Sequence, residues 1–362
     1  MTQREQQILQ LIEEDPMISQ QQIADALGIT RSSAAVHISN LMKKGRIAGK
    51  GYILSSGSYV VVVGGINVDI CGCSFQPLVA ADSNPGRVTT SLGGVGRNIA
   101  QNMSQMGLDV RMLTAYGDDL NGERVATSCA QLGIDLRHAL KVTGAVTSTY
   151  LYLTDPEGEM ALAVSDMAVC DQITPEYLAS NLSVLNNAQA VVADTNIPEA
   201  SLRYLAENCT APLFVDPVST AKAKKLMPIL SRIHTLKPNQ LEAELLTGIS
   251  IHGKADVEKA AKKLLELGVG RVFITRGAEG VYAATENEAL WHPILPGQMV
   301  NTTGCGDSFM GALVWAWMEN LDLAATARAG LAASAITMES TQTIHPSMNE
   351  ETLRQRMEIT NN

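Results

Sequence analysis

The chain has 362 residues, of which 46% are hydrophobic and 18% charged, and its formal net charge at pH 7 is −10. This composition is typical of a globular protein that buries a sizeable core, and the acidic balance excludes a general binder of polyanions. The length favours two domains. The charge is uneven, because residues 1–57 hold six basic and five acidic side chains, so we expect two different modules.

The six cysteines are scattered, and neither a C-x-x-C pair nor a group with histidine has metal-ligand spacing. We interpret them as free thiols in a reducing compartment. The polar segment Thr2–Gln7 is unlike a signal peptide, and no apolar run reaches the roughly 20 residues of a membrane span. The sequence therefore predicts a cytoplasmic protein that does not associate with a membrane.

Three short helices are predicted in the first domain, residues 1–57. The apolar spacing indicates a first helix that ends before Pro16. Ser19 caps a second helix and Thr30 caps a third. The alternating stretch 45–54 contains several glycines and predicts a small β-wing.

This arrangement resembles the winged helix-turn-helix of bacterial transcription regulators, which implies a DNA partner. Useful affinity would then require a dimer, since a monomer makes few phosphate contacts. The alternative is a three-helix module for dimerisation or packing, with solvated charges. The resemblance places Thr30, Arg31, Ser32, Ser33 and His37 in the major groove, and Lys43, Lys44, Arg46 and Lys50 on phosphates.

Residues 58–362 form the second domain, and a Ser- and Gly-containing linker at 55–58 precedes it. Apolar strands alternate with helices there, which is typical of an α/β fold with a doubly wound, mainly parallel sheet. The predicted strands are 59–63, 110–116, 190–194, 213–216, 235–237 and 272–275, and the helices are 122–132, 199–209, 221–230, 239–246 and 254–267.

A β-hairpin over 147–164, with its turn at 155–159, interrupts this alternation. We therefore expect the hairpin to lie off the main sheet and to form a small β lid at about residues 142–165. The alternative is an ordinary edge hairpin.

Polar and glycine residues follow the first strand. Asp69 lies close to its carboxyl end, where α/β sheets place their ligands, and could accept hydrogen bonds from sugar hydroxyls. Gly93, Gly94 and Gly96 lead into a helix that contains Asn98, which favours close backbone contact with a ligand. Each feature is also consistent with a simple turn, and the glycine spacing differs from the dinucleotide fingerprint.

Later strands also end in polar residues. Asn239 and Glu242 lie three residues apart at a helix start, where an amide and a carboxylate can hold hydrated Mg²⁺. A capping box explains the same pair equally well. The turn 275–280 either lines a nucleotide or is only a hairpin turn after a strand.

The stretch 300–309 predicts a loop that ends at a helix N-terminus, with Asp307 in the first turn. Free N–H groups and the helix dipole favour an anion there, and Gly304 and Gly306 allow close approach. Asp307 could take a proton from an attacking hydroxyl. The alternative is a helix start with turn glycines.

These motifs, at 93–98, 239–242 and 302–307, occur in an order that resembles the PfkB (ribokinase-like) carbohydrate kinases over residues 59 to about 355. The resemblance implies ATP-dependent phosphorylation of a sugar or nucleoside hydroxyl, with Asp307 as general base. It further assigns the anion hole to Gly304, Cys305 and Gly306; Mg²⁺ to Asn239 and Glu242; the substrate to Asn67, Asp69, Gly93, Gly94 and Asn98; and the nucleotide to Asn239, Arg276, Gly277, Gly280 and Thr303.

Two residues depart from the family pattern. Asn301 stands where many relatives have Asp, and Cys305 where many have Ala. K⁺ activation is common in the family, with backbone carbonyls near Thr303 and in 334–342 as candidate ligands, and the missing charge of Asn301 is expected to weaken or alter that site. With Asn301 and a fused helix-turn-helix, the chain is most similar to the pseudouridine kinase branch.

We therefore expect phosphorylation of a nucleoside at its 5′-hydroxyl, with pseudouridine as the first candidate, by a homodimer. One alternative is a ligand-responsive DNA-binding regulator whose kinase-like body only senses a sugar or nucleoside, and another is a kinase for a different sugar. The intact Asp307 favours catalysis, because a pure sensor has no need of a base.

Overall fold

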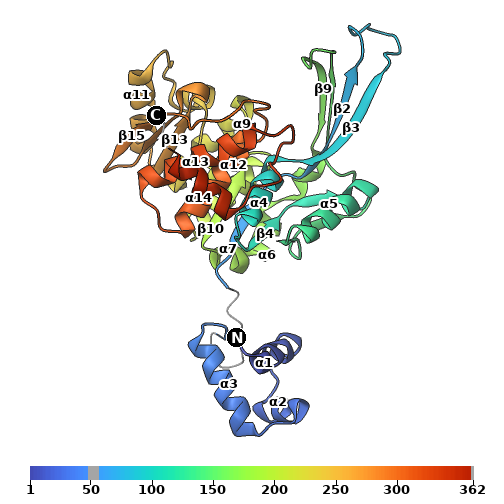
Figure 1. The fold of residues 1–362 in the computed structure, drawn as a ribbon, viewed down its shortest axis with the longest axis vertical. Coiled ribbons are helices and arrows are strands. Elements are labelled where there is room, and N and C mark those ends of the chain that lie inside the picture. The colour runs from blue at the N-terminus through green and yellow to red at the C-terminus, as the bar shows by residue number, and fades with distance from the viewer. Residues whose placement is uncertain (48–56, 360–362) are drawn as a thin grey trace. The chain divides into compact units, whose positions relative to one another are not determined.

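A computed structural model describes residues 1–47 and 57–359, and its fold is drawn in Figure 1. The chain forms two compact units, Met1–Tyr59 and Val60–Asn362, and each has its own hydrophobic core. Within the described residues, no helix combines the length and the apolarity that crossing a membrane requires.

The first unit consists of three helices, α1 (Gln3–Glu14), α2 (Gln20–Leu27) and α3 (Arg31–Lys43). Side-chain oxygens of Thr2, Ser19 and Thr30 accept backbone N–H groups at the three helix starts, which satisfies donors that would otherwise lack a partner. The apolar faces meet in a small core around Ile8 and Leu41. The three predicted helices are confirmed, whereas most of the predicted wing at 45–54 lies outside the described residues.

The centre of the second unit is a nine-stranded sheet in the order β15-β14-β13-β12-β11-β10-β1-β4-β6. Neighbours from β13 to β6 pair in parallel, and β13, β14 and β15 pair antiparallel. This confirms the mainly parallel sheet, and the turn at 275–280 is the hairpin turn between the antiparallel strands β13 and β14. The strands are β1 (Val60–Val63), β4 (Val110–Leu113), β6 (Ile134–Asp135), β10 (Ala190–Asp194), β11 (Leu213–Asp216), β12 (Thr235–Leu236), β13 (Arg271–Thr275), β14 (Val281–Ala284) and β15 (Ala289–His292).

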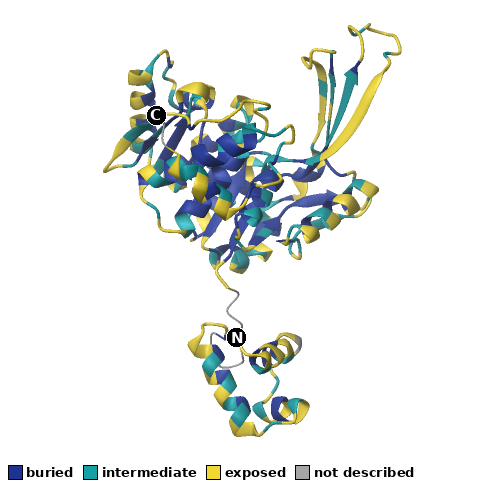
Figure 2. Ribbon diagram, viewed as in Figure 1, coloured by how far each residue is buried: buried dark blue, intermediate teal, exposed yellow. Residues whose placement is uncertain are grey.

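Helix α12 (Cys305–Met318) contacts both α4 (Val95–Gln105) and α13 (Leu323–Met338), and the three helices share one core with the strands. Figure 2 shows this buried centre in dark blue. The other helical segments are α5 (Leu120–Gln131), η1 (Ala168–Gln172), α6 (Pro175–Ser180), α7 (Leu182–Asn186), α8 (Glu199–Asn208), α9 (Thr220–Ala223), η2 (Lys224–Arg232), α10 (Gln240–Thr247), α11 (Lys254–Glu266), η3 (Gly277–Glu279) and α14 (Glu350–Glu358).

A second, four-stranded sheet projects from the body, and Figure 1 shows it as a narrow arm. Its order is β3-β2-β8-β9, with strands β2 (Asn67–Ser74), β3 (Gly86–Gly93), β8 (Thr149–Thr154) and β9 (Met160–Asp166). The predicted hairpin is therefore confirmed and lies off the main sheet. Asp69 follows the first strand as expected but lies within β2 of this arm, so the alternative that it is an ordinary turn residue is wrong. Two short strands, β5 (Ala115–Gly117) and β7 (Leu140–Val142), pair with each other in parallel.

Candidate active site

The loop before α12 brings a helix N-terminus to the carboxyl edge of the main sheet. Gly304 has φ +84°, and a Cβ there would lie 2.0 Å from the Thr343 carbonyl oxygen, so only glycine fits. The Cys305 N–H donates to the Thr302 carbonyl at 3.3 Å. The next first-turn N–H groups, on Gly306 and Asp307, have no acceptor within the helix, which leaves them available for an anion.

Asp307 lies at the base of this loop, in the first turn of α12. Its Oδ2 accepts a hydrogen bond of 2.8 Å from Nδ2 of Asn98, which is 209 residues away on α4. Burial and the nearby Asp216 carboxylate raise the pKa of Asp307 to about 7, although Asn98 and Lys237 act against them. A carboxyl group with a pKa close to neutral is suited to exchange a proton with a substrate hydroxyl.

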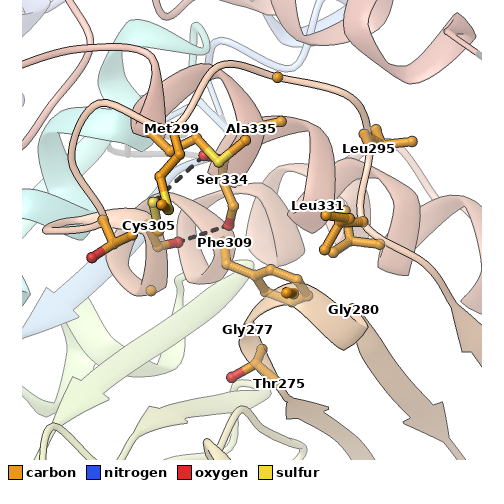
Figure 3. A pocket seen from close by; sticks show the side chains of 16 residues that line it. Thr275, Gly277, Gly280, Leu295, Met299, Cys305, Phe309, Leu331, Ser334 and Ala335 are labelled. Carbon is orange, nitrogen blue, oxygen red and sulfur yellow. Dashed lines mark hydrogen bonds between the residues drawn. The ribbon is translucent and has the colours of Figure 1, made fainter.

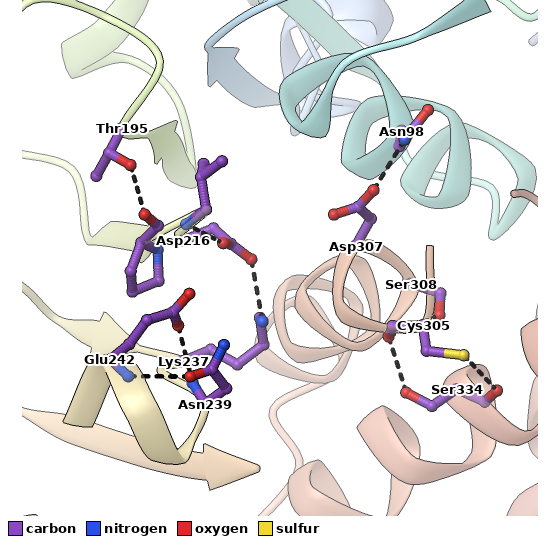
Figure 4. A network of polar contacts seen from close by, with 12 residues as sticks. Asn98, Thr195, Asp216, Lys237, Asn239, Glu242, Cys305, Asp307, Ser308 and Ser334 are labelled. Carbon is purple, nitrogen blue, oxygen red and sulfur yellow. Dashed lines mark hydrogen bonds and ion pairs between the residues drawn. The ribbon is translucent and has the colours of Figure 1, made fainter. Parts of the chain in front are cut away.

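A lysine that sequence reasoning missed lies beside Asp307. Nζ of Lys237 is 3.1 Å from Oδ2 of Asp216, and both side chains are 7% exposed. Figure 4 shows Lys237 reaching towards the start of α12. A Cβ added to Gly306 would meet this Nζ at 3.4 Å, so the ammonium borders the proposed anion hole. Burial lowers the pKa of Lys237, but Asp216 and Glu242 outweigh it and raise the pKa, so the lysine stays charged.

The buried carboxylate of Asp194 holds the turns around the site together. Its Oδ2 accepts N–H groups from Gly65 at 2.9 Å and Gly96 at 2.8 Å, and its Oδ1 accepts the N–H of Asn196. A Cβ on Gly64 would lie 2.5 Å from Oδ2. The backbone before β2 and the start of α4 both contact this one carboxylate. Gly64 and Gly96 are therefore needed, because a side chain at either position would collide with it.

The predicted substrate residues come together at the root of the arm. Asn67 donates from Nδ2 to Oδ1 of Asp69, and a Cβ on Gly93 would lie 2.2 Å from the other oxygen of Asp69. Gly94 has φ +99° and packs against the Gly65 carbonyl. Burial raises the pKa of Asp69 against the opposing effect of the Asn67 hydrogen bond.

Asn239 and Glu242 form the capping box of α10. The Glu242 N–H donates to Oδ1 of Asn239 and the Asn239 N–H donates to Oε2 of Glu242, both at 2.9 Å. Glu242 is buried, and burial raises its pKa. Among the described residues no group of three His, Cys, Asp or Glu could hold a metal alone. A carboxylate oxygen is a ligand that Mg²⁺ prefers, so Glu242 is a residue that fits this ion.

An apolar pocket of about 370 Å³ lies on the other side of α12, and Figure 3 shows its walls. Thr275, Gly277 and Gly280 line one side, which is consistent with the predicted nucleotide role of this turn. Arg276 is not among the lining residues, because its guanidinium donates to Gln240 and Glu279. Thr303 is also absent from the lining. The remaining lining residues are Ala278, Ile294, Leu295, Gly297, Met299, Thr302, Cys305, Gly306, Phe309, Leu331, Ser334, Ala335 and Met338.

Cys305 contributes its side chain to this pocket and not to proton transfer. Its thiol donates to the Ser334 carbonyl at 3.5 Å, and the Ser334 hydroxyl donates to the Cys305 carbonyl at 2.9 Å. Burial and the charge of Asp307 raise the pKa of the thiol to about 11. The thiol is therefore neutral and acts as a small side chain.

The site combines a carboxyl group with a pKa of about 7, a charged lysine beside a helix N-terminus and an apolar pocket. This combination is typical of a phosphotransferase. Residues 58–350 match the family model of pfkB family carbohydrate kinases, and residues 1–48 match that of a winged helix-turn-helix DNA-binding domain. The chain therefore belongs to the pfkB family of carbohydrate kinases and is an ATP-dependent carbohydrate or nucleoside kinase.

Two relatives come from Escherichia coli K12. The uncharacterized sugar kinase YeiI is 37% identical over 97% of this chain and 98% of its own length. A pseudouridine kinase is 39% identical over 80% of this chain and 94% of its own length. A solved structure of a putative sugar kinase from Clostridium perfringens is 30% identical, with a TM-score of 0.76, over 84% of this chain and 96% of that one.

Proposed function

We propose that this kinase phosphorylates a nucleoside at its 5′-hydroxyl, with pseudouridine as the first candidate and Asp307 as the general base. The observation that carries the proposal is the placement of Asp307 between Asn98 on one side and the anion-binding start of α12 on the other. The choice of pseudouridine is supported by the 39% identity to a pseudouridine kinase. Asp69 at the root of the arm is suited to hold the ribose diol.

In the reaction, the hydroxyl proton passes to Asp307 while its oxygen forms a bond to the γ-phosphorus of ATP. The bond between that phosphorus and the β-γ bridging oxygen breaks, and ADP leaves with the electron pair. Lys237 and the N–H groups of Gly306 and Asp307 would face the negative charge on the transferred group. The pocket beside Thr275 and Phe309 would hold the adenosine part of ATP.

We propose that Glu242 would hold Mg²⁺, which would supply positive charge beside the phosphates of ATP. Asp216, Glu242 and Asp307 all lie close to Lys237, which brings several acidic groups and one cation into the same region. Such a site repels free ATP, and a divalent ion bound to the phosphates reduces that repulsion. Asn239 would act through the capping box by fixing Glu242.

The test is an ADP-release screen over pentoses, hexoses and nucleosides, with uridine and pseudouridine compared directly. We expect the highest kcat/KM with a nucleoside. Faster turnover of a free pentose or hexose than of every nucleoside would reject the nucleoside proposal and leave the kinase class intact.

The contacts of Asn301 support the proposal that catalysis by this kinase depends only weakly on K⁺. Its Nδ2 donates to the Thr341 carbonyl at 3.4 Å, and its Oδ1 accepts the Thr303 N–H at 3.0 Å. An aspartate here would place a carboxylate against that carbonyl, and a bound cation would be needed between them. We propose that the amide N–H takes the place of this cation.

Replacing Asn301 with Asp is therefore expected to make turnover depend on K⁺ several-fold. Wild-type turnover should change little when KCl is exchanged for tetramethylammonium chloride at equal ionic strength. Initial rates in the two salts measure this. Strong K⁺ dependence of the wild-type enzyme would contradict the proposal.

A second proposed function, DNA binding, is supported by the helix-turn-helix match at residues 1–48. Arg31 and Ser32 are exposed at the start of α3, as a groove-reading helix requires. Lys44 donates to both carboxylate oxygens of Glu5 at 2.8 Å, so its predicted phosphate contact would have to compete with that ion pair.

Deleting residues 1–57 is expected to remove DNA binding and to spare kinase activity. Gel shifts with genomic fragments at low salt, with and without nucleoside, measure the first effect. The single variant Arg31→Ala in the full chain leaves the three-helix core intact and should weaken DNA binding without abolishing the fold of this domain. Equal retardation by the full chain and the deleted form would contradict this role.

The arm also supports the expected homodimer. Alternate residues on its strands form an apolar face opposite Asp69, and Val88, Leu162 and Val164 on it are 70%, 61% and 59% exposed. We propose that a second copy covers this face. Sedimentation should show a dimer that Leu162→Glu converts to a monomer, whereas a wild-type monomer at micromolar concentration would reject the proposal.

A further inference from the structure

Two tyrosines lie on the same face of the arm as Asp69. In the register of the small sheet, Tyr150 on β8 lies opposite Asp69 on β2, and Tyr152 lies opposite Cys71. Side chains on a strand alternate between its faces, so residues 69 and 71 share a face with residues 150 and 152. This is the face opposite the apolar one described above.

The two rings form a continuous aromatic surface. Their centroids are 5.6 Å apart and their planes differ by 34°. The Tyr150 hydroxyl reaches Sδ of Met160 on the next strand at 3.7 Å, and Met160 pairs with Thr154 near the hairpin turn, so this ring leans along the arm towards that turn. Both tyrosines are only half-buried, which leaves part of each ring open to a ligand.

The neighbours of Tyr152 are small. Cys71 on one side and Ala163 on the other are its direct cross-strand partners. Burial and a hydrogen bond with Cys71 raise the pKa of Tyr152 to about 12, so its ring is uncharged at neutral pH. These small neighbours leave room beside the ring, where another flat aromatic ring can stack.

We propose that Tyr150 and Tyr152 are the base-stacking surface of the substrate site. The proposal rests on the nucleoside kinase function above and assigns the part of the site that distinguishes a nucleoside from a free pentose. With the ribose diol on Asp69, at the root of the arm, the base attached to the same ribose extends along the arm and over the two rings. Stacking accepts any flat base, so the surface selects for a nucleobase rather than for one particular base.

The test compares a nucleoside with ribose in the wild-type protein and in the double variant Tyr150→Ala/Tyr152→Ala. Because base–aromatic stacking contributes measurably for each ring, the variant is expected to bind the nucleoside about 10- to 100-fold more weakly. Its affinity for ribose should stay the same. Dissociation constants from calorimetry, for pseudouridine, uridine and ribose, give both values whether or not each compound is turned over.

Two controls separate stacking from a loss of folding. Tyr150→Phe/Tyr152→Phe keeps both rings and should retain nucleoside affinity. Tyr282→Ala removes a half-buried ring on β14, which packs against Trp291 outside the arm, and should leave the ratio of nucleoside to ribose affinity unchanged.

The outcomes also separate this proposal from the proposed function. If the wild-type protein binds and phosphorylates a nucleoside and the double Ala variant does so equally well, the stacking surface is wrong and the function stands. An equal fall in nucleoside and ribose affinity also overturns the stacking surface. If the wild-type protein binds no nucleoside, both proposals are wrong.

Discussion

Replacing Asp307 with Asn is expected to lower kcat by about 10²- to 10⁴-fold, which is the usual contribution of a general base. The amide cannot accept the substrate proton, although it keeps the size of the carboxyl group. Substrate affinity should change little, since the sugar and nucleotide contacts lie elsewhere. Steady-state kinetics with the best nucleoside measures both quantities.

The pH profile makes this prediction specific. With the pKa of Asp307 near 7, kcat/KM of the wild-type enzyme should rise about tenfold per pH unit below neutrality and level off above it. The Asn variant should lose this rise. The pKa of Asp307 is about 7 in the folded protein, above its ordinary value of 3.8. The folded state therefore binds this proton more tightly than the unfolded chain, and the free energy of unfolding falls as the pH rises from about 4 to about 7. The Asn variant should therefore melt no earlier than the wild type at pH 8, and an active variant would show that another group is the base.

Replacing Lys237 with Met is expected to have the second largest effect, a fall in kcat of about 10²- to 10³-fold, comparable to the loss of one preorganised donor in other enzymes. The variant removes the cation that borders Gly306 and should raise KM for ATP less than it lowers kcat. It also removes a charge that lowers the pKa of Asp307, so the rise in the pH profile should move to higher pH.

A second variant separates this catalytic effect from a folding defect. Lys237→Met alone leaves the buried Asp216 without its partner, which typically costs about 3–5 kcal/mol of stability. The double variant Asp216→Asn/Lys237→Met removes both charges and should recover most of the thermal stability. If recovery of stability also restores kcat, Lys237 has only a structural role.

The main sheet could be predicted because its strands are short apolar runs between helices. Strand β10 begins and ends where the sequence analysis places it, and so does β11. The arm could be predicted only in part, because most of its strand β3 is exposed on both faces and carries no alternation between apolar and polar residues. Its partner β2 starts two residues after the glycine pair at residues 64–65, where a strand is hard to distinguish from a loop.

The site shows the same division. Asp307, Asn98 and Asp69 belong to recognisable motifs, and the fold brings them to one edge of the sheet. The role of Lys237 depends on the register of two parallel strands, since Asp216 ends β11 and Lys237 follows β12. Opposite charges at the ends of two consecutive buried strands are a signal that sequence reasoning could have used. Tyr150 lies beside Asp69 because β8 pairs with β2, two strands that are about 80 residues apart in the sequence. No local sequence pattern indicates this pairing.

The carboxylate of Asp194 has a mechanical consequence. One of its oxygens holds the N–H groups of Gly65 and Gly96, and the whole excursion through β2 and β3 lies between these two residues. Both ends of the β2–β3 part of the arm are thus fastened to one atom at the end of β10. In any movement of the arm, the two ends of β2–β3 would stay in place, and bending would be confined to the residues beyond them. Asp69 lies close to these fixed ends, so it would stay bound to the sugar while the outer part of the arm moves.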